Sequence, residues 1–437
     1  MNFYKSLVPM VMALFGAGLW LAPAAVMAET NCSIPAIVNP EDLVRHSLDC
    51  NGGQQAIDAR WQAQQHRTEM AGYLDDPKLS VGVAPQTLGD ERFDEGYVVE
   101  LSQPLPWPGV LSLRKQAAGA QADAWQAVQK QGLVNLAKQV RLSYAQWRYH
   151  RQLLAINQRH QNLWQEFLSV VRAKYAAGTA TKSDVLQATH DHHLLLQEAI
   201  ELTALVERDI REMKRLGNLG EQTQIRNDDP LPLKDLKSVQ WATLMASLDQ
   251  QPRLQELDAR QQQKAYELSL AKKDRYPSFN VMVRYNSLWM NEEQRWVVGV
   301  GVNLPLSLGK RDRHEDSLRA EQRALRWEQQ DLTAQIRELL IQTRSHWQQA
   351  KDVYALYQQD LLPLAEESLI TTRDEYQSGS GDFLSLLNAQ RQLLSTERAA
   401  EKALRDQFMQ FSQLLAASGV VFEADLYTLR HEEIGDE

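Results

Sequence analysis

The chain contains two copies of one module, and this duplication restricts the folds that are open to it. Landmark residues recur in the same order about 200 positions apart, a period far longer than the roughly 20 to 50 residues of a solenoid unit. The matched residues are Pro77-Lys78-Leu79 with Pro277-Ser278-Phe279, Gln103-Pro104-Leu105-Pro106 with Asn303-Leu304-Pro305, Gly109 with Gly309, and Tyr175, Gly178, Leu186 and Ala188 with Tyr376, Gly379, Leu387 and Ala389. We therefore expect the same order of structural elements twice in one chain.

Each module opens with two short segments in which apolar and polar residues alternate, which is the period of a β-strand with two different faces. In the second module Phe279, Val281, Val283 and Tyr285 alternate with Asn280, Met282, Arg284 and Asn286, and residues 296–303 continue the pattern. Residues 78–83 and 97–102 show it in the first module. Outer-membrane strands carry this pattern, and so does a half-buried hairpin in a soluble sheet. Alternation alone leaves both interpretations open.

A long helical stretch follows each strand pair, at residues 110–174 and 310–375, with no Gly or Pro except Gly119, Gly132 and Pro363. At 1.5 Å per residue each would be about 100 Å long. After a Tyr-x-x-Gly turn, shorter helices are predicted to return at 182–217 and 382–417. The apolar seam predicted for the second long helix is Leu332, Ile336, Leu339, Thr343, Trp347, Ala350, Tyr354, Tyr357 and Leu361. Because the other faces are polar, these seams need partners.

Targeting signals and composition limit the compartment and the partners. Residues 1–28 have the basic start, apolar run and small final residues of a secretory signal, with cleavage expected before Glu29. Beyond it no apolar stretch of about 18 residues predicts a spanning helix, so a membrane crossing would use strands. The net charge of -9 and the scatter of basic residues among acidic ones argue against nucleic acid. In an oxidising compartment Cys32 and Cys50 are expected to form a disulfide.

The predicted organisation follows the repeat. It comprises a signal segment at 1–28, an N-terminal segment at 29–76, the first repeat at 77–217, an inter-repeat segment at 218–276, the second repeat at 277–418 and a tail at 419–437. Within the inter-repeat segment, residues 218–240 predict a loop and residues 241–275 predict helices.

Four strands per chain require partners if they lie in a membrane. The smallest membrane barrels need about eight strands, and an open strand edge cannot face lipid because its amides would lack hydrogen-bond partners. A trimer supplies about twelve strands, although two or four copies satisfy the same arithmetic. The strand count therefore predicts an oligomer without selecting its size.

Three motifs make the chain resemble the TolC family of outer-membrane efflux channels across most of its length. The first is Ser102-Gln103-Pro104-Leu105-Pro106-Trp107-Pro108-Gly109, which is similar to the segment found in the subgroup paired with heavy-metal and multidrug RND pumps. The second is Lys174-Tyr175-Ala176-Ala177-Gly178 followed by Ser183-Asp184-Val185-Leu186-Gln187-Ala188. The third is its echo, Glu375-Tyr376-Gln377-Ser378-Gly379 followed by Phe383-Leu384-Ser385-Leu386-Leu387-Asn388-Ala389-Gln390.

The resemblance implies an α+β membrane protein. Four transmembrane strands per chain would contribute to a trimeric barrel of about twelve strands, and long antiparallel helical hairpins would form a periplasmic α-barrel. It implies a homotrimer that meets a periplasmic adaptor and an inner-membrane pump, of the RND type by the subgroup motif, with heavy-metal cations as a candidate cargo. Drug efflux and ABC-type protein secretion stay open as alternatives, and a periplasmic adaptor is a weaker one because adaptors carry one hairpin per chain.

The predicted functional residues fall at the strands and at the hairpin turns. Alternation places Glu100, Asn280, Arg284 and Asn286 toward the lumen and Phe279, Val281, Tyr285, Trp296 and Val300 toward lipid. The resemblance places Tyr175, Gly178, Tyr376 and Gly379 at the hairpin tips that meet the partner. It also makes Asp184, Asp374 and Asp382 gate candidates, because acidic side chains repeated around a threefold axis attract cations. For Asp382 helix capping is the alternative. The family often carries two aspartates where this chain has Ser385 and Asn388.

Catalytic and metal chemistry finds little support in the sequence. His190 and His193 share a helix face at a spacing that can chelate a soft cation, but no third ligand is visible, so an exposed polar patch is the favoured interpretation. No nucleophile elbow, zinc protease motif or phosphate-binding loop occurs. We therefore expect a protein that is not an enzyme and needs no cofactor.

Overall fold

The computed structural model describes residues 32, 36–37, 39–85, 96–225, 231, 241, 245, 247–289 and 291–422. The predicted signal segment, its cleavage site before Glu29, and the tail beyond Phe422 lie outside the described residues. The chain forms two compact units. The first includes Ala63–Ala122 and Arg260–Leu325, and the second includes Cys32–Gln62, Asp123–Ala259 and Arg326–Glu437. Each unit therefore takes segments from both sequence repeats.

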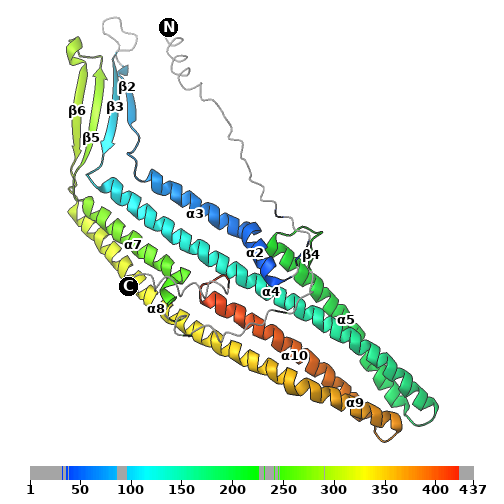
Figure 1. Cartoon of the computed structure of the whole chain (residues 1–437). Coiled ribbons are helices and arrows are strands. Elements are labelled where there is room, and N and C mark those ends of the chain that lie inside the picture. Colours follow the sequence, from blue (N-terminus) through cyan, green and yellow to red (C-terminus); the bar gives the residue numbers. More distant parts are fainter. Residues whose placement is uncertain are drawn as a thin grey trace, which may run out of the picture. The chain divides into compact units, whose positions relative to one another are not determined.

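The first unit contains a four-stranded antiparallel sheet built from both modules (Figure 1). Its strands are β2 (Lys78–Val83), β3 (Tyr97–Leu105), β5 (Ser278–Asn286) and β6 (Trp296–Asn303). They lie in the order β2-β3-β5-β6, so β3 and β5 join the two modules at the centre. The predicted alternating segments are thus strands, and β2 and β6 are the edges of the sheet.

The remaining elements are mainly helices, as the sequence predicts. The long helices and their returns are α4 (Val110–Ala176), α5 (Lys182–Gly217), α8 (Leu308–Leu356), α9 (Leu362–Ser378) and α10 (Phe383–Ala417). The others are α2 (Pro40–Cys50), α3 (Gly52–Met70), α7 (Pro252–Lys273), and the short helices η3 (Ser247–Gln250) and η4 (Glu292–Gln294). Each predicted hairpin is therefore a helix pair with a short connection.

A single π-helical turn, Tyr357–Leu361, separates α8 from α9. The amide of Leu362 donates to the carbonyl of Tyr357, five residues earlier. Pro363 has no amide hydrogen to donate, so an unbroken α-helical ladder could not pass through it. The wider turn lets the helix continue at the position where proline would otherwise break it.

Two positions of the seam predicted for the second long helix, Leu339 and Leu361, are exposed in the single chain. Ile336 and Trp347 are buried as expected, but Leu339 is 41% exposed and Leu340, at 1%, takes its place in the core. The helical period of 3.6 residues puts position 340 rather than 339 on the face of Ile336 and Trp347. Leu361 is also exposed, because it belongs to the π-helical turn, which changes the face that the helix presents.

The inter-repeat segment contains a strand that the sequence did not predict. The prediction of a loop over 218–240 is wrong at β4 (Gln224–Ile225), which pairs in parallel with β1 (Ala36–Ile37). Two residues are too few to show a period of two, so alternation could not identify either strand.

The core of the second unit lies between α2, α4, α5 and α10. It is built around Leu43, Tyr144, Trp147, Met213 and Phe408, all at most 2% exposed. The helices come close at Gly132, where an added Cβ would lie 2.7 Å from Oε1 of Gln54. A glycine in a long helix is unfavourable by itself, so this close approach of α3 to α4 accounts for it.

Candidate functional site

One face of the sheet is apolar and exposed. The pairing register aligns Val81 with Val99, Val99 with Tyr285, and Val281 with Val300, so the apolar residues of all four strands share this face. Exposed fractions reach 75% for Val298, 68% for Leu79 and 67% for Val81. A soluble hairpin would bury such a face, whereas a contiguous exposed apolar surface marks an interaction with lipid or protein.

Aromatic side chains cluster at both ends of this face. At one end Tyr285 lies 5.7 Å from Tyr97 and 5.2 Å from Trp296, measured between ring centroids. At the other end Trp107 stacks on Tyr276 at 4.9 Å and on Phe279 at 6.0 Å. From Tyr276 to Tyr285 the chain extends about 30 Å along the strand, or roughly 23 Å when tilted by about 40°. Membrane strands have an apolar band of about 25 Å between two aromatic girdles.

The opposite face is polar and carries the four residues predicted to face a lumen. Arg284 bonds to Glu100 Oε2 through Nη2 at 2.5 Å and Nε at 2.7 Å. Asn280 pairs with Gly301 in the register, and Asn286 accepts a hydrogen bond from the amide of Leu288 at the end of β5. These four side chains share one face because their positions match in the alternation, and the sheet brings together residues from both repeats.

The two hairpin turns have the same backbone geometry. In the first, Gly178 has φ +74°, and the amides of Thr179 and Gly178 donate to the carbonyls of Lys174 (2.9 Å) and Tyr175 (3.0 Å). The second turn repeats both bonds, from Ser380 to Glu375 (3.0 Å) and from Gly379, with φ +84°, to Tyr376 (3.3 Å). This is the Schellman motif, in which glycine takes the left-handed conformation without strain. An added Cβ would meet nothing within 4 Å at either position, so glycine is favoured there by the positive φ and not by a lack of space.

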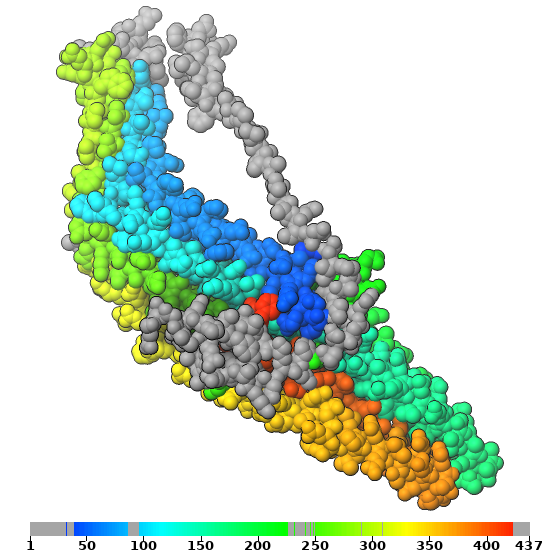
Figure 2. Space-filling view, in the orientation of Figure 1, coloured from blue at the N-terminus to red at the C-terminus, as the bar shows by residue number. Residues whose placement is uncertain are grey.

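The two tyrosines at equivalent turn positions differ in exposure. Tyr175 is 47% exposed, whereas Tyr376 is 5% exposed and packs in a cluster shared by α4, α5, α9 and α10. Lys174 bonds to the carbonyl of Tyr376, and its Nζ lies 4.4 Å from the centre of the tyrosine ring. Burial, aided by the charge of Asp184, raises the pKa of Tyr376. Figure 2 shows the ends of both hairpins side by side. Of the two tyrosines, only Tyr175 is available for a partner.

The three carboxylates considered for a gate lie near these turns. Asp184 forms a capping box with Thr181: its side chain accepts from the Thr181 amide at 2.9 Å. Asp382 is the N-cap of α10 and accepts from the amide of Ser385 at 2.9 Å and from its hydroxyl at 2.8 Å. The Ser385 amide and hydroxyl lower the pKa of Asp382. Asp374 is exposed, 3.5 Å from its neighbour Arg373. Capping thus accounts for Asp184 and Asp382 structurally.

The two histidines considered for a metal are engaged locally. His193 Nδ1 lies 2.7 Å from the carbonyl of Thr189, and His190 Nδ1 lies 3.4 Å from Asp191. Within the described part of the chain no group of three potential ligands is close enough to hold a metal ion. The Asp191 carboxylate instead pairs with Arg391 of α10 at 2.7 Å.

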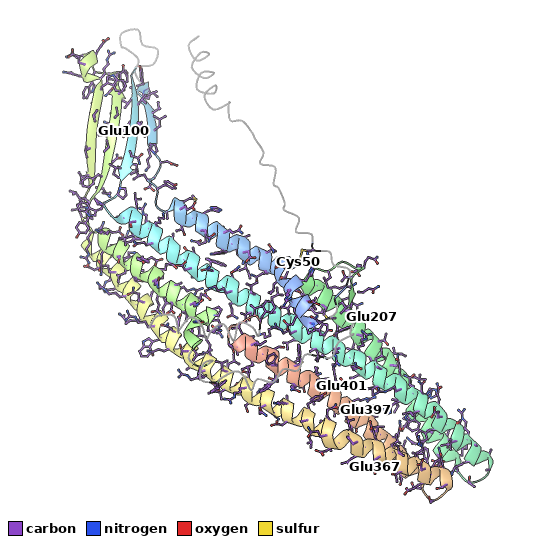
Figure 3. All side chains as sticks on the ribbon, in the orientation of Figure 1. Cys50, Glu100, Glu207, Glu367, Glu397 and Glu401 are labelled. Atoms are coloured by element: carbon purple, nitrogen blue, oxygen red, sulfur yellow. A yellow bond between two sulfur atoms is a disulfide. The ribbon has the colours of Figure 1, made fainter. Side chains whose placement is uncertain are left out.

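A row of buried polar contacts inside the helical core was not predicted. His150 Nδ1 lies 2.5 Å from Asp209, and His160 Nε2 lies 2.8 Å from Glu397. Glu397 and Glu401 both lie on α10 (Figure 3). Burial raises the pKa of Glu401, which the charge of Arg148, 3.6 Å away, opposes. The sequence does place polar residues on the apolar side of α4, but the sequence alone could not show which residues they contact. Further pairs join Arg398 to Glu198 and Asn157 to Glu198.

Cys32 and Cys50 are bonded in the structure, with their Cα atoms 5.8 Å apart. The bond closes a loop with a sequence separation of 18 residues. In the chain-entropy account a loop of this size stabilises the folded state by about 3 kcal/mol.

We expect replacement of both cysteines, Cys32→Ser with Cys50→Ser, to destabilise α2 locally and to leave the sheet assembled. The reason is that the bond lies in the second compact unit, while the sheet belongs to the first. Limited proteolysis near α2, compared with the amount of protein recovered in the outer-membrane fraction, measures both effects. Two free thiols in protein extracted without reductant would contradict the bond.

In the described part of the chain, no helix is both long enough and apolar enough to cross a membrane.

A sheet with one exposed apolar face, in a chain with two long helical hairpins and matching turns, defines the class of outer-membrane channel subunits. The chain belongs to the outer membrane efflux protein family, whose sequence profile matches residues 55–216 and 244–420. It is a TolC-family outer membrane factor, located in the outer membrane, in a family of channels rather than enzymes.

The chain is 26% identical over 310 residues to the alkaline protease secretion protein AprF of Pseudomonas aeruginosa, a match that covers 66% of this chain and 59% of that relative's length. Among solved structures, it resembles the outer-membrane channel OprN with a TM-score of 0.73 and 17% identity, over 87% of this chain and 89% of that one. It also resembles VceC of Vibrio cholerae, with a TM-score of 0.71 and 15% identity, over 87% and 96% of the two chains. The structural likenesses support the mostly helical fold with a small antiparallel sheet.

Proposed function

We propose that this protein is one third of a trimeric exit duct that passes substrates through the outer membrane. The observation that carries the proposal is the sheet, whose apolar face is exposed and whose edge strands β2 and β6 have no strand beyond them in the described chain. An unpaired edge cannot face lipid. Three copies join edge to edge into a barrel of about twelve strands, with the polar face of Glu100 and Arg284 toward the lumen.

The helical hairpins extend this duct into the periplasm, where a periplasmic adaptor meets it and connects it to an inner-membrane pump. Tyr175 and Leu384, which is 62% exposed, lie at the two hairpin turns and are the side chains that we assign to this contact. Both glycine turns keep these residues at the ends of rigid helices.

Two kinds of inner-membrane partner are supported by separate observations. The segment from Ser102 to Gly109 favours an RND pump, and with it export of heavy-metal cations or drugs. Similarity to a protease secretion protein favours protein secretion instead. We propose the RND pump as the partner, because the segment from Ser102 to Gly109 lies at the junction of β3 and α4, within the duct itself. Metal, drug and protein-secretion phenotypes of a deletion strain separate the two.

Fractionation of the mature protein tests the duct itself. We expect heat-modifiable trimers in the outer-membrane fraction. A monomeric protein in the soluble periplasmic fraction would contradict the proposal.

We further propose that Asp184 and Asp382 contribute to a cation-selective entrance in addition to capping their helices, with Asp374 as a third contributor. Asparagine caps a helix as well as aspartate does, because its side-chain oxygen accepts the backbone amide. At position 382 the asparagine NH2 group replaces the oxygen that accepts from the Ser385 hydroxyl, and it can donate to that hydroxyl instead. Asp184→Asn with Asp382→Asn therefore removes charge and keeps the caps. We expect reduced cation selectivity and weaker block by divalent ions in single-channel recordings. Unchanged selectivity would leave both residues as caps only.

Asp382→Ala provides the matched control, because it removes the cap as well as the charge. We expect it to increase proteolysis at the second turn, which the asparagine variant should not do.

The pKa of the Asp382 carboxyl is lowered in the folded state. Its stabilising contribution is therefore present above the ordinary pKa of 3.8 and is lost as the pH falls through the pKa of the folded state.

A further inference from the structure

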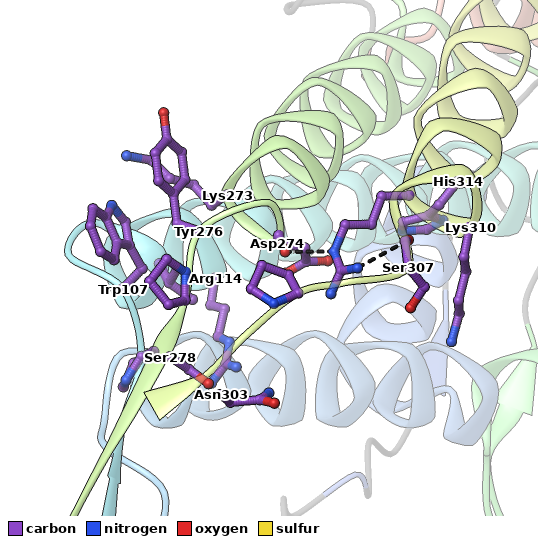
Figure 4. A pocket seen from close by; sticks show the side chains of 15 residues that line it. Trp107, Arg114, Lys273, Asp274, Tyr276, Ser278, Asn303, Ser307, Lys310 and His314 are labelled. Atoms are coloured by element: carbon purple, nitrogen blue, oxygen red, sulfur yellow. Dashed lines mark hydrogen bonds between the residues drawn. The ribbon is translucent and has the colours of Figure 1, made fainter. Parts of the chain in front are cut away.

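A cavity of about 380 Å³ lies at the helix end of the sheet, within the first compact unit (Figure 4). Its walls come from the segment after β3, the start of α4, the end of α7 and the start of α8. Four lysine and arginine side chains and one aspartate line it: Arg114, Lys273, Lys310, Arg311 and Asp274. This concentration of positive charge occurs in a chain whose net charge is -9.

The cations in the cavity are weakly neutralised. Arg311 donates to the carbonyls of Asp274 (2.7 Å) and Ser307 (3.0 Å), and neither acceptor carries the opposite charge. Among described residues, no carboxylate forms an ion pair with Lys273, Lys310 or Arg311, and Arg114 reaches Asp75 only at 3.8 Å. The site therefore retains positive charge that an anion can use.

The position of two of these cations is unfavourable for the helix that carries them. Lys310 and Arg311 fall in the first turn of α8, which contains no acidic residue. Positive charge at a helix N-terminus opposes the helix dipole. The dipole of α8 thus does not account for these residues. The bonds to the carbonyls of Asp274 and Ser307 give Arg311 a structural role, whereas for Lys310 an anionic ligand supplies the reason.

Apolar and aromatic groups adjoin the charged cavity. Trp107 and Tyr276 form part of its wall, and Lys273 Nζ lies 5.5 Å from the Tyr276 ring centre. The neighbouring Leu306 is 85% exposed and Tyr276 is 50% exposed. Beyond Phe279 the apolar face of the sheet begins. A ligand with an anionic head and an apolar tail matches this arrangement better than a free anion does.

We propose that this cavity binds the phosphate of an anionic phospholipid of the inner leaflet, with Lys273 and Lys310 contacting the headgroup and the acyl chains lying along the apolar face. The inference rests on the proposed function, because it needs the helix end of the sheet to lie at the periplasmic membrane surface. Basic residues near membrane ends commonly bind anionic headgroups, each contributing about fivefold in affinity.

The test is native mass spectrometry of the purified full-length protein with equal amounts of dioctanoyl phosphatidylglycerol and dioctanoyl phosphatidylcholine. We expect phosphatidylglycerol to be preferred at least about tenfold. The double variant K273Q/K310Q should lose about 25-fold in affinity for it, since each lysine contributes about fivefold. Neither side chain bonds to the backbone among described residues, so folding should be unaffected.

K272Q/R313Q is the matched control, because it removes the same charge from the same two helices outside the cavity. It should bind as the unaltered protein does. Equal binding of the two lipids, or unaltered binding by K273Q/K310Q, would overturn the site. Displacement of the lipid by an equal concentration of inorganic phosphate would overturn its assignment to a lipid. Membrane fractionation of the same preparation tests the duct separately, so outer-membrane trimers without lipid preference contradict only this inference.

Discussion

We expect Val281→Arg to impair trimer assembly in the outer membrane and Asn280→Arg to be tolerated. Val281 lies on the apolar face near the middle of β5, opposite Val300, while Asn280 lies on the polar face opposite Gly301. An arginine on the lipid face costs about 2 to 4 kcal/mol at the midplane, and a trimer contains it three times. The yield of heat-modifiable trimer in outer membranes measures the effect.

The two substitutions occupy neighbouring positions and introduce the same side chain, so they differ only in the face that they modify. Because a shift of one residue exchanges the two faces of a strand, the pair also tests the register of the sheet. Equal trimer yields from both variants would contradict the lipid-facing assignment.

We expect Trp147→Ala to lower the stability of the second compact unit by about 3 to 5 kcal/mol, the usual cost of removing a large buried aromatic side chain. Trp147 is 1% exposed and packs edge-on against Tyr144, with ring centroids 5.3 Å apart. Its cluster joins α2, α4, α5 and α10, so no single helix can move to fill the cavity that the missing indole ring would leave. Thermal unfolding of the purified protein, followed by circular dichroism, should show a lower transition temperature.

Trp147→Phe is the control for this effect. The indole Nε1 has no hydrogen-bond partner among the described residues, so phenylalanine removes volume without breaking a polar contact. We expect less than half the loss seen with alanine. Equal losses would mean that packing of the ring is not what stabilises the unit.

The strands and helices could be predicted because their signals are local. Alternation predicted a strand over 279–286, where β5 spans Ser278–Asn286. The absence of breakers predicted a helix over 110–174, where α4 spans Val110–Ala176. The two glycine turns were also recognisable, since Gly178 and Gly379 follow a tyrosine at the same spacing in both repeats. Because the same turn motif occurs in both repeats, each occurrence supported the prediction of the other.

Contacts between distant segments could not be predicted in the same way. Tyr175 and Tyr376 occupy equivalent positions, yet only the second is buried, because the cluster around it is made by helices of both repeats. Likewise Asp191 stood beside His190 and His193 in the sequence, but its partner is Arg391, 200 residues away. Such pairings depend on how helices pack, which a local pattern does not contain.

The π-helical turn lies in the interval where the two repeats differ in length by one residue. Gly109 and Gly309 are separated by 200 positions, whereas Gly178 and Gly379 are separated by 201. The second copy therefore gained one residue, or the first lost one, between these landmarks. A turn closed by a bond across five residues holds one more residue than an α-helical turn, and Tyr357–Leu361 lies in this interval. We infer that the π-helical turn accommodates the extra residue of the second repeat. The residues beyond the turn then keep the same positions on the helix as in the first repeat, so both hairpins end in the same glycine turn.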